Sequence, residues 1–354
     1  MANGAAVRGG SSGSNGRRAR ATLRDVAEAA GTSRSTASRA LGGHGYVADH
    51  IRERVQAAAE RLGYVPDVSA RTLKGRGSGL VGVLVSDLRN QFYAELAAGV
   101  EHTLSAAGYQ MVLVDDHSDD ERAAAGARAF LAMRADGVLL TPVGRTATEN
   151  LVGHGVPVAE MDRRSGVRGC DVVSIDNERG ARLAVEHLIA LGHRDIGIVV
   201  DETQWDTGRN RLKGYRAALR DAGLATPRRH VLDLSRSEGV GDQRTQLTAF
   251  FDGNSAVTAV FAANNVMAEL VWQELKRRGA DVPSSCSLVS FDDLAWMKMV
   301  EPGVTAVRQP VFDLGGRAAE LLLARIGRDD AGRAGSVVLE PELVVRGSTV
   351  APKG

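Results

Sequence analysis

Residue types that commonly do chemistry occur in this chain, but their spacing does not match catalysis or metal binding. His187 and His193 lie six residues apart, which suits a helix residue and a turn residue better than two metal ligands. The sequence contains no GxxxxGK[ST] or HExxH motif. We therefore predict no catalytic residues, no metal site and no cofactor, and we do not expect an enzyme.

Two pairs of adjacent carboxylates, Asp115/Asp116 and Asp292/Asp293, each follow an apolar stretch. Adjacent residues on a strand point in opposite directions, so neither pair is arranged for shared acid–base work. Each pair is either a solvated turn or the source of one carboxylate for a cleft at the carboxyl edge of a sheet, where α/β proteins bind ligands. The sequence leaves both interpretations open.

Residues 77–82, Gly-Ser-Gly-Leu-Val-Gly, match the GxGxxG pattern of dinucleotide sites. Such a site requires the motif to follow a strand and to open a helix, so that backbone N–H groups meet the pyrophosphate. Here the motif precedes an apolar stretch that is typical of a strand. We therefore reject a dinucleotide site.

Beyond residue 79, short apolar stretches alternate with amphipathic segments, a pattern typical of parallel α/β layers. The predicted strands are 80–85, 110–114, 137–140, 158–161, 172–175, 196–200, 230–232, 259–262, 288–291 and 304–307. The predicted helices include 92–107, 120–134, 179–190, 209–222, 243–251, 266–277 and 312–326. So many strands exceed one ordinary sheet, which favours two similar α/β lobes.

The segment from Thr22 onward has the outline of a helix-turn-helix. Thr22 is placed to cap a first helix, Gly31 ends it, and Ser33 is placed to cap a second helix over about 34–41. A third, supporting helix is indicated by apolar residues on one face: Ile51, Val55, Ala58 and Leu62. The sequence therefore predicts a three-helix unit ahead of the α/β lobes.

The chain is predicted to divide into four parts. Residues 1–21 are rich in Gly, Ser, Ala and Arg without an apolar period, so we expect a disordered basic tail. Residues 22–66 form the helix-turn-helix domain, and 67–79 form a hinge, with a two-turn helix up to Gly75 and a flexible joint over 76–79. Residues 80–354 form the two-lobed body, which we expect to bind an effector and to dimerise.

Composition and charge narrow the class of protein. The 354 residues suffice for two or three domains, at roughly 100–200 residues each. No stretch of 18 apolar residues or secretory signal is seen, and two cysteines suit a reducing compartment, so we expect a cytoplasmic protein without a membrane span. The net charge of +1 divides into +7 over residues 1–76 (13 basic, 6 acidic) and −6 over the remainder (31 basic, 37 acidic). A basic head on an acidic body indicates that one part meets phosphate.

Several motifs in consistent order resemble the lactose-repressor (LacI/GalR) family over about residues 22–350. The resemblance in the helix-turn-helix rests on Thr22-Leu23-Arg24-Asp25-Val26-Ala27 and Thr36-Ala37-Ser38-Arg39-Ala40-Leu41, followed by Leu62-Gly63-Tyr64-Val65-Pro66. In the body it rests on Asp176-Asn177, Leu191-Gly192-His193, Arg211-Leu212-Lys213-Gly214-Tyr215, Phe291-Asp292-Asp293 and Val344-Val345-Arg346-Gly347-Ser348. The family implies a helix-turn-helix headpiece joined to two lobes of the periplasmic-binding-protein type.

The resemblance also implies a DNA-binding transcriptional regulator, expected to be a repressor, that binds a palindromic operator at the nucleoid as a homodimer. Arg34 opens the recognition helix and either pairs with a guanine or clamps a phosphate, and Arg39 lies one turn further on the same face. Leu73 matches a leucine that wedges into the minor groove. The predicted DNA-binding residues are Thr22, Ser33, Arg34, Ser35, Thr36, Ser38, Arg39, Ala70 and Leu73.

By the same resemblance, an effector cleft lies between the two lobes. The residues implied to line it are Asn90, Phe92, Tyr93, Asp162, Arg211, Asn264 and Asp292. Asp, Asn and Arg pair with hydroxyls and flat aromatic rings cover apolar sugar faces, so the implied effector is a carbohydrate. Trp205 and Trp296 either add rings to the cleft or pack inside a lobe, and Arg211 has the alternative of a surface helix charge.

Some residues depart from the family pattern and leave the effector open. Gln91 stands where Pro is usual, and Asn265 where Asp is common. The sequence has no leucine heptads after Ser348, so a dimer is expected rather than a tetramer. The alternative function is a solute-binding protein of a transport system, which would share the body but leaves the headpiece unexplained. A third alternative is an enzyme of the α/β class, but the sequence shows no assembled catalytic nucleophile.

Overall fold

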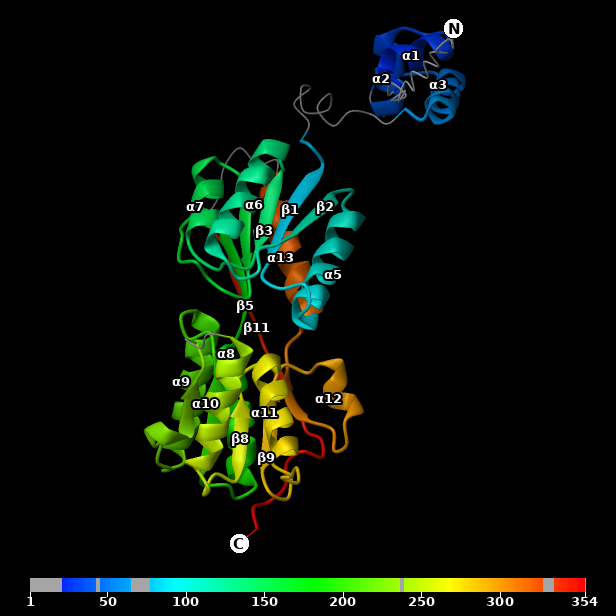
Figure 1. Cartoon of the computed structure of the whole chain (residues 1–354). Helices are drawn as coiled ribbons and strands as arrows, with labels where there is room; N and C mark the ends of the chain where they lie inside the picture. Colours follow the sequence, from blue (N-terminus) through cyan, green and yellow to red (C-terminus); the bar gives the residue numbers. More distant parts are fainter. Residues whose placement is uncertain (1–20, 43–44, 65–76, 236–238, 327–333, 354) are drawn as a thin grey trace, which may run out of the picture. The chain divides into compact units, whose positions relative to one another are not determined.

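The computed structural model describes residues 21–42, 45–64, 77–235, 239–326 and 334–353. The chain divides into two compact units, one up to Arg76 and one over Gly77–Gly354 (Figure 1). Among the described residues, no helix is long and apolar enough to span a membrane. Each unit has its own hydrophobic core and is described separately below.

The first unit contains three helices, α1 (Leu23–Ala29), α2 (Arg34–Gly42) and α3 (Asp49–Leu62), as the sequence predicts. Thr22 caps α1 in a capping box with Asp25, and Ser33 Oγ accepts a hydrogen bond from the Thr36 backbone N–H at the start of α2. Small apolar side chains from all three helices form the core, among them Val26, Ala37 and Val55. Because these residues are small, the helices pack closely.

The first lobe of the second unit is a six-stranded sheet in the order β11-β5-β4-β3-β1-β2, with parallel pairing throughout. Its strands are β1 (Leu80–Val85), β2 (Gln110–Asp115), β3 (Gly137–Leu140), β4 (Val158–Met161), β5 (Asp171–Ile175) and β11 (Ser336–Leu339). Its helices are α5 (Gln91–Ala106), α6 (Asp120–Met133), α7 (Thr146–Gly153) and α13 (Val311–Arg325). Helices α5 and α13 cover one face of the sheet, and α6 and α7 cover the other (Figure 1).

The second lobe is a six-stranded sheet in the order β12-β10-β9-β8-β6-β7. Its strands are β6 (Ile196–Val200), β7 (Val231–Asp233), β8 (Ala259–Ala262), β9 (Ser287–Phe291), β10 (Thr305–Arg308) and β12 (Glu342–Val344), and only β12 runs antiparallel to its neighbour. Its helices are α8 (Asn177–Ala190), α9 (Asp206–Asp221), η1 (Arg228–His230), α10 (Val240–Asp252), α11 (Asn265–Arg277) and α12 (Ala295–Met299). Helices α8 and α9 pack on one face, and α10 and α11 on the other.

Three short segments connect the lobes: from β5 to α8, from β10 to α13, and from β11 to β12. In each case the chain leaves one sheet and enters the other within a few residues, as Figure 1 shows near β5 and β11. Connections this short act as hinges in two-lobed proteins. The predicted two-lobed α/β fold is therefore confirmed.

Most predicted strands and helices agree with the structure to within about three residues, and five short elements are additional: α7, η1, α12, β11 and β12. Helix α12 has five residues, β11 is an edge strand with alternating exposure, and β12 is an edge strand of three residues, none of them buried, so their sequences carry weak apolar patterns. The expected flexible joint also needs correction. Ser78 is buried, and the backbone N–H groups of Ser78 and Gly79 both donate to the Asp136 carboxylate at 2.7 Å.

The two histidines considered as metal ligands, His187 and His193, occupy structural positions. His187 lies in α8, and His193 follows that helix, where its ring nitrogens contact Thr258 Oγ1 at 2.8 Å and the Val350 carbonyl at 2.9 Å. Burial lowers the pKa of His193, so its ring stays neutral at pH 7. Across the described part of the chain, no group of His, Cys, Asp and Glu side chains is arranged to hold a metal ion.

Candidate effector cleft and nucleic-acid interface

All seven residues implied for the effector cleft line one cavity between the lobes. Four come from the first lobe and three from the second: Asn90, Phe92, Tyr93 and Asp162, and Arg211, Asn264 and Asp292. The cavity measures about 120 Å³. This is below the roughly 300–1,000 Å³ of sites for drug-sized ligands, so it suits a small ligand or a cleft that is partly closed.

The carboxyl ends of the strands position these side chains. Asp162 follows β4 and Asp292 follows β9, and both adopt positive φ angles, 65° and 77°. Asp tolerates this left-handed conformation better than most residues, and the sharp turn directs each carboxylate toward the cavity. Asn90 caps α5 and Asn264 caps α11, so both amides lie where a strand passes into a helix.

Arg211 is buried in the cavity wall, which excludes the alternative of a surface helix charge. Its Nε donates to Asn177 Oδ1 at 2.7 Å and its Nη1 donates to the Ala263 carbonyl at 2.8 Å. The guanidinium also lies 3.8 Å from the centroid of the Phe291 ring. These contacts from three elements fix the direction of the Arg211 side chain.

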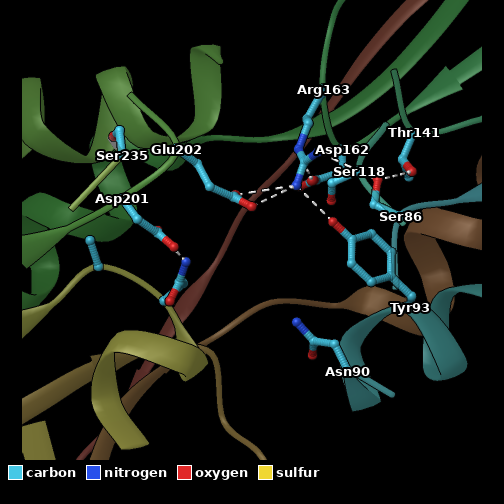
Figure 2. Close-up of polar contacts among 12 residues, drawn as sticks. Ser86, Asn90, Tyr93, Ser118, Thr141, Asp162, Arg163, Asp201, Glu202 and Ser235 are labelled. Atoms are coloured by element: carbon cyan, nitrogen blue, oxygen red, sulfur yellow. Dashed lines mark hydrogen bonds and ion pairs between the residues drawn. The ribbon is translucent and has the colours of Figure 1, made fainter. Parts of the chain in front are cut away.

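Arg163, which the sequence argument did not select, lies at the centre of the polar contacts (Figure 2). Its Nη2 donates to the Tyr93 hydroxyl at 2.7 Å and lies 3.2 Å from both carboxylate oxygens of Glu202 in the second lobe. Its guanidinium lies 3.5 Å from the centroid of the Trp205 ring. Arg163 therefore joins the two lobes. Trp205 contacts the cleft through Arg163 but does not line the cavity, whereas Trp296 packs against Trp272 in the second lobe.

The two departures from the family pattern also bridge the lobes. Asn265 Nδ2 donates to Asn90 Oδ1 at 2.9 Å, and Asn90 Nδ2 lies 3.4 Å from Asn265 Oδ1. Gln91 Oε1 accepts a hydrogen bond from the Ala295 backbone N–H at 3.4 Å. Together with the Arg163–Glu202 pair, these contacts hold the cleft nearly closed, which accounts for the small cavity.

Carboxylates outnumber cations around the cavity. The lining includes Asp87, Asp162, Asp201, Glu202 and Asp292, but only two arginines, Arg163 and Arg211. Burial raises the pKa of Asp162 to about 6, despite the opposing attraction of Arg163 and Arg211. Burial and repulsion from Glu202 raise the pKa of Asp201 to about 7. The cavity therefore carries negative charge that its own arginines do not balance.

Several buried polar atoms at the cavity have no hydrogen-bond partner. They are Asp162 Oδ1, Arg163 Nε, Thr207 Oγ1 and Gln309 Oε1, and all four residues line the cavity. A buried polar group without a partner costs about 1–3 kcal/mol. A polar ligand that supplied the missing donors and acceptors would recover this free energy, so the cavity has the chemistry of a ligand site.

The residues that the sequence argument missed follow the same rule as those it found. Arg163 comes two residues after β4 ends, Asp201 and Glu202 come directly after β6, and Gln309 comes directly after β10. The rule that ligands bind at the carboxyl ends of strands would have selected all four. The resemblance instead selected positions one by one and passed over their neighbours.

The surroundings of the two carboxylate pairs decide between the two interpretations of each pair, a solvated turn or a cleft carboxylate. Asp292 faces the cavity, whereas the buried Asp293 pairs with Arg346 and Arg308. Asp116 is also buried, and burial raises its pKa to about 7. The interpretation as a solvated turn is therefore wrong for these three carboxylates, while Asp115 accepts backbone N–H bonds from Leu88 and His117.

The predicted DNA-binding residues that the structure describes gather on α2 and at the start of α1. Arg34, Ser35 and Arg39 are exposed, while Ala37 and Ala40 on the opposite face of α2 are buried. The hydroxyls of Thr22 and Ser33 cap helices, and Thr36 and Ser38 are partly buried. Ala70 and Leu73 lie outside the described residues.

Tyr46 is a further candidate that the sequence argument did not name. Its side chain is 91% exposed, between α2 and α3. Only 4% of the chain is aromatic, and most of its rings are buried or partly buried. An aromatic residue beside the Gly-rich break at 42–45 was the available signal.

Comparison with known proteins agrees with this geometry. The family model for bacterial regulatory proteins of the lacI family matches residues 22–67, and the model for the periplasmic binding protein-like domain matches residues 185–349. The chain is 30% identical to the HTH-type transcriptional regulator DegA of Bacillus subtilis, covering 93% of this chain and 98% of DegA. It is equally identical, at 30%, to the ribose operon repressor of Haemophilus influenzae, covering 93% of this chain and 98% of that repressor.

Solved structures give the same result. The cellobiose complex of the transcriptional regulator CelR matches with a TM-score of 0.69 and 32% identity, covering 93% of this chain and 100% of that chain. The Lac repressor dimer bound to operator and the anti-inducer ONPF matches with a TM-score of 0.81 and 26% identity, covering 94% and 100%. All four proteins are named as regulators or repressors of transcription and none as an enzyme. The chain belongs to the LacI family of bacterial transcriptional regulators.

Proposed function

We propose that this regulator represses transcription by binding a palindromic operator as a homodimer in the cytoplasm, and that a small polyhydroxylated effector, a carbohydrate, controls the binding. The observation that carries the proposal is the set of buried polar atoms without partners around the cavity, contributed by both lobes. An effector that pairs with them changes the relative free energy of open and closed lobes. A difference of this kind is what shifts a two-state equilibrium.

In the headpiece, we assign base contacts to the exposed face of α2. Arg34 and Ser35 open this helix, where side chains of a recognition helix reach base edges in the major groove. We assign Arg39 to a base or a phosphate one turn further along. Thr22, Ser33, Thr36 and Ser38 would position the helix or contact the backbone, and Ala70 and Leu73 would enter the minor groove at the operator centre.

The domain boundaries complete this proposal: a basic tail over 1–21, the headpiece over 22–66, a hinge over 67–79, and a sensor body from 80 onward that also dimerises. The short segments that connect the lobes allow one lobe to move against the other. In this mechanism the movement changes the separation of the two hinges in the dimer, and so the fit of two headpieces to one operator. The headpiece favours this function over a solute-binding protein of transport, which needs no helix-turn-helix.

The names of similar proteins support a carbohydrate effector. One relative is a ribose operon repressor, and one structural neighbour is a complex with cellobiose. The cavity offers aspartate, asparagine and arginine side chains together with the buried rings of Phe92 and Tyr93. Such a combination orients hydroxyls and covers the apolar face of a sugar ring.

The test is selection of bound DNA from random sequence by the full chain, repeated with a panel that includes ribose and cellobiose. We expect a palindrome with half-sites about one helical turn apart, and a sugar that changes the recovered fraction. The sign of that change decides between induction and co-repression. If a chain that starts at Leu80 bound DNA as tightly as the full chain, the proposed headpiece function would be wrong.

A further inference from the structure

The buried cavity atoms without partners include more hydrogen-bond acceptors than donors. Asp162 Oδ1 and Gln309 Oε1 are buried acceptors without a donor, Thr207 Oγ1 can act in either role, and Arg163 Nε is the single pure donor among the four unpaired cavity atoms. All four side chains are at least nine-tenths buried, so bulk water reaches them poorly. A ligand that satisfies this cavity must therefore bring more donors than acceptors.

The charges of the cavity point in the same direction. Arg211 is held by Asn177, the Ala263 carbonyl and the Phe291 ring, and Arg163 is held by Glu202, Tyr93 and the Trp205 ring. Both cations are thus engaged by the protein itself. Five carboxylates line the same space, although Asp87 pairs with Arg89 outside it.

The remaining four carboxylates outnumber the two arginines, and Arg163 is shared between Asp162 at 3.6 Å and Glu202 at 3.2 Å. The pKa of Asp162 is raised to about 6 and that of Asp201 to about 7, because burial and neighbouring carboxylates disfavour their ionised forms. Asp116, with a further buried oxygen that has no donor, lies close enough to interact electrostatically with Arg163. An anionic ligand would add to this excess of negative charge, whereas a cation would relieve it.

We propose that the effector carries a protonated amino group beside its hydroxyls, as an aminated sugar or another amino polyol does. This inference rests on the proposed function of the cleft and narrows its ligand class. An ammonium group brings three donors and no acceptor, together with one positive charge. The hydroxyls of the same molecule would be held by Asn90, Asn264 and Gln309.

The cleft already accommodates two cations, Arg163 and Arg211, so its surroundings suit positive charge. The Arg163 guanidinium sits against an aromatic ring and a carboxylate, an arrangement that favours cations. The ammonium group of the effector would lie beside Asp201 and beside Asp162 Oδ1, the buried oxygen of Asp162 that has no hydrogen-bond partner. Charge-assisted hydrogen bonds are about twice as strong as neutral ones, so the amine should bind roughly tenfold more tightly than the same molecule without it.

The experiment uses isothermal titration of the full chain at pH 7, in a buffer free of amino polyols. The probes are glucosamine, galactosamine and mannosamine, each with its parent hexose and its N-acetyl derivative, together with ribose, cellobiose and gluconate. We expect at least one amine to bind roughly tenfold more tightly than both its parent and its N-acetyl form. Titration in two buffers of different ionisation enthalpy should show proton release, because the ammonium group favours ionised carboxylates.

Two variants separate a direct role from a structural one. Asp201→Asn keeps the acceptor for Asn264 but removes a charge, so it should abolish most of the preference for the amine, measured as the ratio of the affinities for the amine and its parent sugar. Glu101→Gln, on the exposed side of α5, is the matched control and should leave the preference intact.

The proposal is overturned if no amine binds, if a neutral sugar binds as tightly as its amine, or if gluconate binds more tightly than both. The effect of the same probes on operator binding separates this failure from failure of the proposed function. If a neutral sugar altered operator binding, the proposed sugar-responsive repressor would stand, and only the inference of an amino group on the effector would fail. If operator binding responded to no probe, both this inference and the carbohydrate effector would be rejected.

Discussion

The headpiece and the effector cleft place their candidate functional residues in opposite environments. Arg34, Ser35 and Arg39 on α2 are exposed, and the buried face of the same helix consists of alanines. In the cleft, Asp162, Arg163 and Arg211 are themselves buried. The headpiece thus separates recognition from stability on two faces of one helix, whereas the cleft assigns both tasks to the same side chains.

The difference follows from what each region must bind. A duplex is larger than the headpiece and is met from outside, so exposed side chains suffice. A small ligand must be surrounded, which requires polar groups inside the protein with few of their hydrogen bonds satisfied. Substitutions in the headpiece should therefore change binding alone, and substitutions in the cleft should change binding and stability together.

The largest expected effect is that of Arg211→Ala. Loss of the guanidinium leaves Asn177 Oδ1 and the Ala263 carbonyl without their donor inside the cavity wall. We expect the free energy of unfolding of residues 77–354 to fall by about 2–4 kcal/mol, because two charge-assisted hydrogen bonds are lost and their acceptors stay buried. Chemical denaturation of the full chain measures this change.

The control for that substitution is Arg216→Ala, which lies on the exposed side of the same helix, α9. It should change the free energy of unfolding by no more than about 0.5 kcal/mol. Equal losses for the two variants would contradict the view that cleft residues also carry stability.

The second prediction concerns Arg34→Ala in the headpiece. If Arg34 pairs with a guanine, its loss should remove roughly 1–3 kcal/mol of discrimination at one position in each half-site. Because Arg34 is exposed, the melting of the headpiece should not change measurably. Binding to a set of operators with single base changes measures the first effect, and circular dichroism measures the second.

Arg61→Ala supplies the comparison for the headpiece, since Arg61 is exposed at the end of α3. That variant should weaken all operators to a similar small extent or leave them unchanged. A uniform loss of affinity for Arg34→Ala across all base changes would instead identify Arg34 as a phosphate clamp.

The contrast between the two regions also explains what the sequence could predict. The signals that define the headpiece helices lie close together in the sequence. Thr22, Gly31 and Ser33 mark the helix ends through short-range contacts, and the structure has helices at those places. The strands of the body were also predictable, because buried parallel strands are continuous apolar runs. Weakly patterned elements such as the five-residue α12 were not.

The cleft is non-local and was predictable only in part. Asp162 and Asp292 lie 130 positions apart in the sequence, and only the two sheets bring their strand ends to one cavity. The resemblance supplied those positions, but it could not supply the Arg163–Glu202 contact or the Asn90–Asn265 pair. These depend on how the lobes close, which no short-range pattern in the sequence reports.

The third prediction uses pH to test the charge of the cleft. The pKa of Asp162 in the folded chain is about 6, above its ordinary value, so its protonated form is favoured by folding. This contribution to stability is complete below about pH 4 and is lost as the pH rises through 6. Asp162→Asn removes the dependence and tolerates the positive φ angle of 65° at this position.

Relative to the variant, the wild-type chain should therefore lose on the order of 2 kcal/mol of unfolding free energy between pH 4 and pH 8. Denaturant titrations of both proteins across this range measure the difference, and the histidines affect both equally. If the difference in unfolding free energy between the two proteins stayed constant with pH, folding would not raise the pKa of Asp162.

The smallest effect distinguishes stability from recognition inside the headpiece. Thr22 caps α1, and its hydroxyl accepts the Asp25 backbone N–H at 3.3 Å. Thr22→Ala should reduce the local stability of α1 by about 1 kcal/mol, seen as roughly fivefold faster amide exchange over residues 23–29 in the full chain. Thr22→Ser keeps the cap and should restore wild-type exchange. If Thr22→Ala instead weakened operator binding while exchange stayed unchanged, Thr22 would act through DNA contact, and the two tasks would meet at one side chain in the headpiece as they do in the cleft.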